Sequence, residues 1–172
     1  MALLQRRDPR PMYEAIDPVH QAVHEKGMYT ISKTFKGVAN NAFVDIHIVP
    51  PTGYEAHTRI VIVCEGKAYF TSYVGTTYTN EGTAITPFNR VTNGDATTAV
   101  VKFGTTPLVL GTQRGDDMIN GGTGGNSSGG TLNQDIESII SPTQDLLLRV
   151  QNVAGTAKDI GFIVNYYMRK TT

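Results

Sequence analysis

Two histidines lie four residues apart near the start of the chain, a spacing that suggests metal chemistry. On a helix, His20 and His24 would present their imidazoles on one face. Zinc proteases use this spacing, but there a Glu follows the first histidine as the general base, and here that residue is Gln21. A third ligand would have to come from afar, from His47, His57 or an acid. We therefore expect no metal site, and a metal-dependent hydrolase is kept only as a third hypothesis.

A glycine-rich segment, GGTGGNSSGG at residues 121–130, raises the question of phosphate binding. A phosphate-binding loop of the P-loop type needs a Lys and a Ser or Thr after its last glycine, at the start of a helix. Here Gly130 is followed by Thr131, and no lysine occurs between residues 103 and 157. The pattern favours a flexible excursion between strands, and we predict no nucleotide or other cofactor.

Neighbouring carboxylates and a lone cysteine are the other candidates for catalysis. Asp116 and Asp117 are adjacent, whereas Asp135 and Glu137 would share one face of a strand, which favours a solvated face over acid–base chemistry. Cys64 ends the apolar run RIVIVC and is expected to be a small buried hydrophobe. We predict that the chain has no catalytic residues and is not an enzyme.

Several tyrosines raise the possibility of a sugar-binding platform. The chain has no tryptophan, the side chain that stacking sites favour, and tyrosine on a strand more often lies at the edge of the core with its hydroxyl at the surface. The platform would be formed by Tyr69, Tyr73, Tyr78, Tyr166 and Tyr167.

The composition restricts the classes of protein that this chain can belong to. Its 172 residues suit one domain, and its 15 basic and 15 acidic residues argue against direct binding to nucleic acid through a basic field. The longest apolar run, IVIVC, is too short to span a membrane, and no apolar stretch typical of a secretory signal follows the first arginines. We expect the chain to be made and folded in a reducing cytoplasm.

Residues 1–27 differ from the rest and are predicted to form an N-terminal arm. Pro9, Pro11 and Pro18 prevent one continuous helix, but DPVHQAVHEKG can form a short helical turn that begins at Asp17 and stops at Gly27. The arm is basic near its start. Three candidate contact residues lie there beside a single acid: Arg6, Arg7 and Arg10.

From Met28 onwards the apolar residues alternate with polar ones, which is the pattern of half-buried strands. In RIVIVC, for example, Ile60, Ile62 and Cys64 share one face, and in the last strand Ile160, Phe162 and Val164 do so. EGK at residues 65–67 predicts a tight hairpin between two strands. The whole predicts eight or nine short strands over residues 28–172, an all-β antiparallel sandwich with a jelly-roll-like arrangement and an extended N-terminal arm.

Four segments together resemble a small β-sandwich protein encoded near the major capsid protein in tailed bacteriophages. They are HQAVHEKGMYTIS, EGTAITPFNR, GGTGGNSSGG and DLLLRVQNVAGTAKDIGFIVNYY. Gly82, Thr83, Asn89 and Arg90 match the middle motif of that family. The closing aromatic pair of the family is followed by an acid, but here Tyr166 and Tyr167 are followed by a methionine and an arginine.

The resemblance implies a capsid decoration, or cement, protein on the outer surface of the virion. Its partner would be the major capsid protein, it would be a dimer or trimer, and it would bind neither nucleic acid nor a membrane. The arm would contact acidic capsid residues through Arg6, Arg7 and Arg10. The alternative is a receptor- or glycan-binding module of a head fibre or tail, which would use the tyrosines and the glycine-rich loop.

Overall fold

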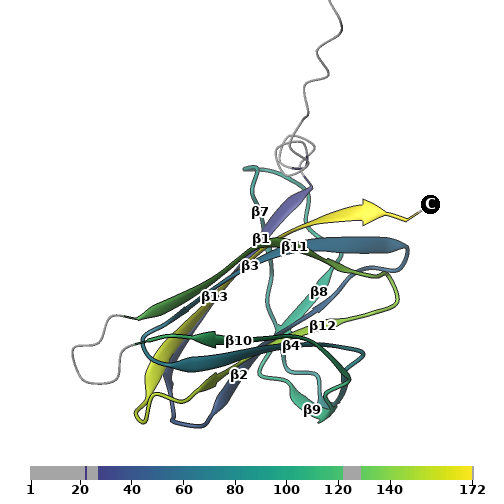
Figure 1. Ribbon diagram of the computed structural model, residues 1–172. Coiled ribbons are helices and arrows are strands. Elements are labelled where there is room, and N and C mark those ends of the chain that lie inside the picture. Colours follow the sequence, from purple (N-terminus) through teal and green to yellow (C-terminus); the bar gives the residue numbers. More distant parts are fainter. Residues whose placement is uncertain (1–21, 23–26, 122–128, 172) are drawn as a thin grey trace, which may run out of the picture.

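Two antiparallel sheets packed face to face make up the protein (Figure 1). The computed structural model describes residue 22 and residues 27–121 and 129–171, without the side chains of residues 134–136. The five-stranded sheet has the order β11 (Gly130–Ile140), β3 (Tyr54–Cys64), β13 (Lys158–Lys170), β1 (Met28–Val38) and β7 (Phe88–Asn89). The six-stranded sheet has the order β10 (Thr112–Ile119), β4 (Ala68–Val74), β12 (Leu146–Asn152), β2 (Phe43–Val49), β8 (Val100–Phe103) and β6 (Thr83–Ala84). A small two-stranded sheet joins β5 (Thr77–Asn80) to β9 (Thr106–Val109).

The long strands are wrapped so that the first half of the chain pairs with the second. β1 pairs with β13 and β2 with β12, while β3 lies between β11 and β13, and β4 between β10 and β12. This nested pairing across two sheets is the jelly-roll arrangement. The all-β sandwich predicted from the alternating pattern is confirmed, and no helix in the described residues is long and apolar enough to cross a bilayer.

The hairpin predicted at EGK is wrong. β3 and β4 lie in opposite sheets, so the connection at residues 65–67 crosses from one sheet to the other. Gly66 fits this crossing because a Cβ there would lie 2.6 Å from the Cβ of Ala154. A short turn with a glycine indicates that the chain reverses, but it does not distinguish a hairpin from a crossing between two layers.

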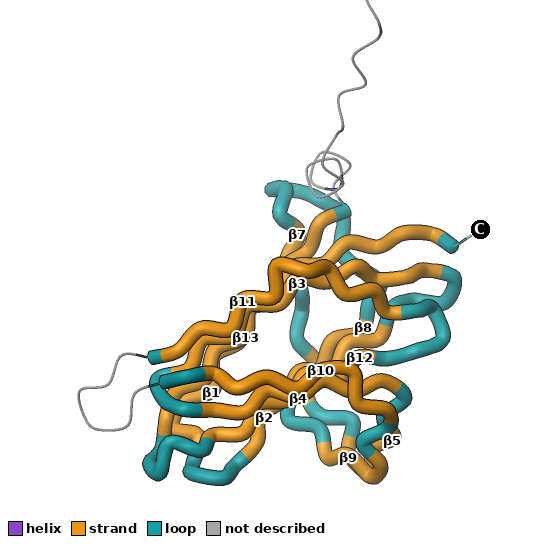
Figure 2. The backbone as a smooth tube through the Cα atoms, in the orientation of Figure 1, coloured by secondary structure: helices purple, strands orange, loops and turns teal. Residues whose placement is uncertain are grey.

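Residues 75–111 form an excursion between β4 and β10 that extends both sheets (Figure 2). β8 pairs with β2 and β6 with β8, while β7 pairs with the start of β1. The excursion thereby covers strand edges that would otherwise be unpaired. We call the part formed by β5 and β9 the β5–β9 lobe. The alternating pattern missed β5 and β10, because both strands are exposed and polar along most of their length.

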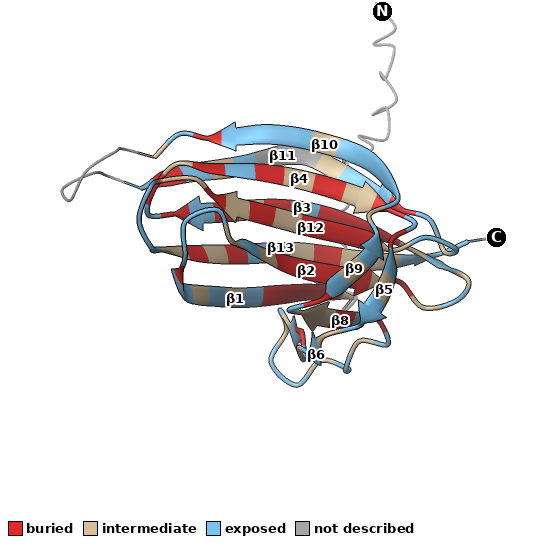
Figure 3. Cartoon of the chain, turned by 90° about the horizontal axis from the view of Figure 1, so that it is seen from below, coloured by how far each residue is buried: buried red, intermediate tan, exposed pale blue. Residues whose placement is uncertain are grey.

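The core fills the space between the sheets, and burial alternates along the central strands (Figure 3). Ile60, Ile62 and Cys64 point inward as predicted, and burying a side chain of isoleucine size contributes about 1.5–3 kcal/mol. Tyr166 is also fully buried, and its hydroxyl donates to Oγ1 of Thr97 at 3.2 Å.

Candidate functional site

A buried histidine lies between two carboxylates on the outer face of the five-stranded sheet. Nε2 of His57 is 3.0 Å from Oε1 of Glu55, and its Nδ1 contacts Oε1 of Glu137. The ring stacks on Tyr167 with centroids 4.6 Å apart, and the Tyr167 hydroxyl donates to the same Glu137 oxygen at 2.9 Å. We call these four residues the His57 cluster.

The local backbone brings Glu137 to this position. β11 carries an irregularity between Gln134 and Ser138, where three residues lie opposite the single residue Arg59 of β3. Such a bulge redirects side chains out of the regular alternation. Glu137 was expected on a solvated face; it lies on the outer face of the sheet with its side chain 26% exposed, and there it binds His57 and Tyr167.

The His57 cluster is an arrangement for holding strands together. Both ring nitrogens of His57 contact carboxylate oxygens of neighbouring residues, so the ring links β3 to β11 within the sheet. Burial, followed by the hydrogen bond and the charge of Glu137, raises the pKa of Tyr167 to about 12, so its hydroxyl stays protonated and donates.

A second histidine and tyrosine share a carboxylate on the outer face of the six-stranded sheet. Nε2 of His47 is 2.9 Å from Oδ2 of Asp145, and the Tyr78 hydroxyl donates to the same oxygen at 3.0 Å. The other oxygen of Asp145 accepts from the backbone N–H of Gly75 at 2.7 Å and of Thr76 at 3.2 Å. We call His47, Asp145 and Tyr78 the His47 cluster.

Asp145 is the acceptor that ties the β5–β9 lobe to the sheet. Burial raises the pKa of Asp145, but the hydrogen bonds from His47, Gly75 and Tyr78 outweigh burial and leave this pKa below its usual value. Burial and the charge of Asp145 raise the pKa of Tyr78. A histidine–aspartate pair also occurs in nucleophilic catalysis, where the second ring nitrogen contacts a hydroxyl or thiol. Here Nδ1 of His47 is buried and contacts no such group among the described residues.

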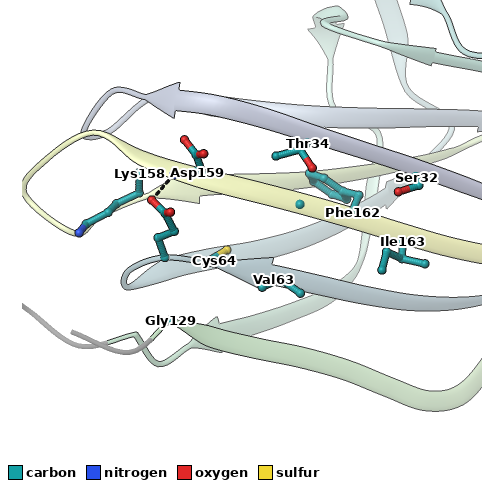
Figure 4. Close-up of a pocket in the computed structure, with 11 residues that line it drawn as sticks. Ser32, Thr34, Val63, Cys64, Gly129, Lys158, Asp159, Phe162 and Ile163 are labelled. Atoms are coloured by element: carbon teal, nitrogen blue, oxygen red, sulfur yellow. Dashed lines mark hydrogen bonds between the residues drawn. The ribbon is translucent and has the colours of Figure 1, made fainter. Parts of the chain in front are cut away.

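A groove of about 680 Å³ lies on the outer face of the five-stranded sheet, between Thr34, Val63 and Ile163 (Figure 4). Gly161 also lines it. A Cβ at Gly161 would lie 3.8 Å from Oγ1 of Thr34, its nearest neighbour. Val63 and Ile163 line the groove with apolar surface. Glu65 also lines it and accepts the N–H of Asp159 at 3.0 Å. Neither His47 nor His57 is among the lining residues.

The structure separates most of the residues that the sequence suggested together. His47 and His57 lie on β2 and β3, in different sheets. Of the tyrosines, Tyr166 is in the core, Tyr78 and Tyr167 belong to the two histidine clusters, and only Tyr69 and Tyr73 share an outward face. No group of three or more His, Cys, Asp or Glu side chains within the described ranges could hold a metal ion.

The structure describes some of the other residues that the sequence singled out, and the rest lie outside the described part of the chain. Cys64 is buried as predicted, and burial raises the pKa of its thiol to about 11. Asp116 and Asp117 are both exposed on the edge strand β10. The other candidates lie outside the described residues: Arg6, Arg7, Arg10, His20, His24 and the glycine-rich residues 122–128.

Sequence reasoning missed both histidine clusters. Apart from the contact of Glu55 with His57, the hydrogen bonds of both clusters join residues at least 30 positions apart in the chain, so no local motif could reveal them. The only local signal was a histidine on the polar face of a strand, in AFVDIHIVP and in HTRIVIVC.

Comparison with known proteins gives no further assignment. No protein-family model, no curated protein and no solved structure matches this chain.

Proposed function

We propose that this chain is a bacteriophage head decoration protein, which binds the outside of the capsid and stabilises it by bridging capsid subunits. It acts by binding and not by catalysis. Its partner is the major capsid protein, and it is a dimer or trimer on the outer surface of the virion. Because one fold serves many functions, the sandwich fold alone does not support this function, and the argument depends on the side chains that its outer faces expose.

The observation that carries the proposal is that both outer faces of the sandwich expose apolar side chains on strands. The five-stranded sheet exposes Val63 and Ile163, and the six-stranded sheet exposes Phe43, Tyr69 and Met118. Exposed apolar patches mark interaction sites more often than chance would give. Since the two faces point in opposite directions, one molecule can contact two neighbours at once, as bridging requires.

Bridging does not need a strong single interface. When one molecule holds two neighbouring subunits, the second contact forms at high effective concentration, so modest contacts add up to firm attachment. The arm contributes further contacts through Arg6, Arg7 and Arg10, which pair with acidic residues of the capsid. These pairs are salt-dependent, because ions screen exposed charges.

The test is binding of purified protein to heads that lack it, followed by electron microscopy to locate the added density. We expect density on the outer surface of the head, and we expect deletion of residues 1–17 to weaken binding while the sandwich stays folded. The variant R6Q/R7Q/R10Q should also weaken binding. A matched control removes the same charge from the exposed surface of the sandwich, as K36Q/R114Q/K170Q. Density on the tail, or heads that bind no protein, would refute the proposal.

A glycan-binding module of a head fibre or tail is the second candidate. It is favoured by Tyr69 and Phe43, two exposed aromatic rings on the same sheet face. Binding of the purified protein to immobilised glycans, lost when both rings are removed, would support this candidate over decoration.

A further inference from the structure

We infer that two copies of this chain form a two-fold dimer through the β5–β9 lobe. The inference rests on the proposed function only for the role of the dimer on the capsid, and it names the surface and the symmetry that the proposed function leaves open. The contact is made by two neighbouring residues of β9 in each copy, Leu108 and Val109. We call these two residues the lobe tip.

The lobe tip consists of the two most exposed large apolar side chains in the described residues. Leu108 is 67% exposed and Val109 59%. Pro107 and Leu110, on either side, are half-buried, so four apolar residues follow one another in the chain. Figure 3 shows that β5 and β9 are exposed along most of their length. Because exposed apolar residues favour association, a run of this kind indicates an interaction site.

The pairing of β5 with β9 sets Leu108 apart from the ladder. Two consecutive residues of β5 pair with Val109 and Pro107, so Leu108 is an extra residue that lies opposite no residue of β5. Such bulges re-aim side chains and occur where a strand has a function beyond pairing. The irregularity therefore accompanies the most exposed apolar side chain of the lobe.

Two largely buried carboxylates beneath the lobe hold it in place. Asp145 accepts the backbone N–H groups of Gly75 and Thr76 and is 12% exposed. Asp45 is buried and accepts the N–H of Thr105 at 2.9 Å. Because these bonds fix the lobe before any contact forms, association loses little conformational entropy there.

The absence of charge from the lobe selects a second copy as its partner. A two-fold contact places a surface against an identical surface, so a charge near the axis meets the same charge and is repelled. Residues 68–80 and 104–113 contain no Asp, Glu, Lys, Arg or His. Glu81 and Lys102, the charged residues closest in sequence to β5 and to β9, pair with each other. The lobe can therefore meet its own copy without repulsion.

The outer faces of the two large sheets meet this condition less well. Glu55 and Arg59 of β3 stand on the outer face of the five-stranded sheet. Asp116 of β10 and Arg149 of β12 are both cross-strand neighbours of Thr71, on the outer face of the six-stranded sheet. Charged faces suit a different protein with complementary charges, whereas the lobe tip suits a copy of itself.

The first experiment measures the mass of the purified full chain by sedimentation equilibrium over a range of concentrations. Because the lobe tip is small beside the interface of a stable dimer, we expect a mass that rises with concentration towards that of two chains. The variant L108S/V109S should raise the dissociation constant of the dimer about tenfold or more. The matched control, F88S/I139S, removes two apolar side chains of β7 and β11 that are 52% and 55% exposed, and it should dimerise as the wild type does.

The second experiment tests the two-fold axis by disulfide formation and does not depend on how L108S/V109S folds. A disulfide needs Cα atoms within about 7 Å of each other, a distance that a two-fold axis beside the lobe tip provides. We expect L108C or V109C to form a covalent dimer several-fold faster than I139C under mild oxidation. The native Cys64 is 1% exposed and should not react. Thermal unfolding checks that every variant folds.

Four outcomes would overturn the inference. They are a wild-type chain that stays monomeric at every concentration, a mass that converges on three chains, a dimer lost in F88S/I139S but kept in L108S/V109S, and cysteines at the lobe tip that link no faster than I139C. Binding of monomers to heads that is lost in L108S/V109S would assign the lobe tip to the capsid instead. A dimer that depends on the lobe tip, with heads that bind no protein, would refute decoration and leave the inference standing.

Discussion

The outer faces of the two sheets carry similar residues and use their charges differently. On the five-stranded sheet, Glu55 and Glu137 both bind His57. On the six-stranded sheet, Asp145 binds His47 beneath the β5–β9 lobe, while Lys67 and Arg149 lie against aromatic rings without a carboxylate among the described residues. On the five-stranded sheet one imidazole thus contacts two carboxylates, whereas on the six-stranded sheet one carboxylate contacts an imidazole, a tyrosine hydroxyl and two backbone N–H groups.

The histidine clusters themselves differ in how far they are buried. The side chain of Asp145 is 12% exposed and serves four donors, whereas the side chain of Glu137 is 26% exposed and serves two. A buried acceptor that is removed leaves its donors unsatisfied, but water can replace an acceptor that is partly exposed. The two clusters should therefore differ in their contribution to stability.

The largest effect is expected for Asp145→Ala. This change leaves the N–H groups of Gly75 and Thr76, the Tyr78 hydroxyl and Nε2 of His47 without their acceptor. We expect the free energy of unfolding to fall by about 3–5 kcal/mol, measured by urea denaturation. Hydrogen exchange should locate the opening in the β5–β9 lobe, and a loss below about 1 kcal/mol would show that Asp145 does not anchor it.

Glu137→Ala should lower the free energy of unfolding less than Asp145→Ala does, by about 1–2 kcal/mol in urea denaturation. Glu55 still contacts His57, and water reaches the vacated position. The loss should be confined to β11 and its irregularity opposite Arg59. If Glu137→Ala is as damaging as Asp145→Ala, the difference in burial does not decide the stability of the two clusters.

Alkaline pH should weaken the His57 cluster through Tyr167. The pKa of Tyr167 is raised from 10.0 to about 12, so above pH 10 the folded protein keeps a proton that the unfolded chain loses. The stability that the Tyr167 hydroxyl contributes through its raised pKa is fully present below pH 10, and it is lost as the pH rises towards about 12. Urea denaturation across this range should show a shallower decline for Tyr167→Phe. Because Tyr78 and Tyr166 also have raised pKa values, the comparison with this variant is essential, and equal declines would contradict the assignment.

The smallest effect is expected for Gly161→Ala, on the open part of the five-stranded sheet. The added methyl group meets only ordinary contacts, with Oγ1 of Thr34 at 3.8 Å, and it restricts the unfolded chain. We expect a gain of about 0.5–1 kcal/mol, seen as a small rise in Tm. Gly66→Ala is the matched control, since its methyl group would lie 2.6 Å from Cβ of Ala154 and should destabilise the protein.

Much of the fold could be predicted from local patterns, whereas the pairing could not. Alternation placed Ile60, Ile62 and Cys64 in the core because a strand exposes successive side chains to opposite faces. It failed for β10, whose polar residues reflect its position at a sheet edge. It also failed at EGK, where the same turn chemistry joins two sheets and not two neighbouring strands.

The sequence by itself determined the class of fold and the inward faces of its central strands, since the alternation of apolar and polar residues can be read along the chain alone. Only the tertiary structure decided which outward residues meet. Leu147 looks like an outward residue beside Arg149, yet it is fully buried, because its cross-strand neighbours His47 and Tyr73 lie on a face that the β5–β9 lobe helps to cover. The histidine clusters have the same origin: strands distant in sequence become neighbours only when the chain folds into its two sheets.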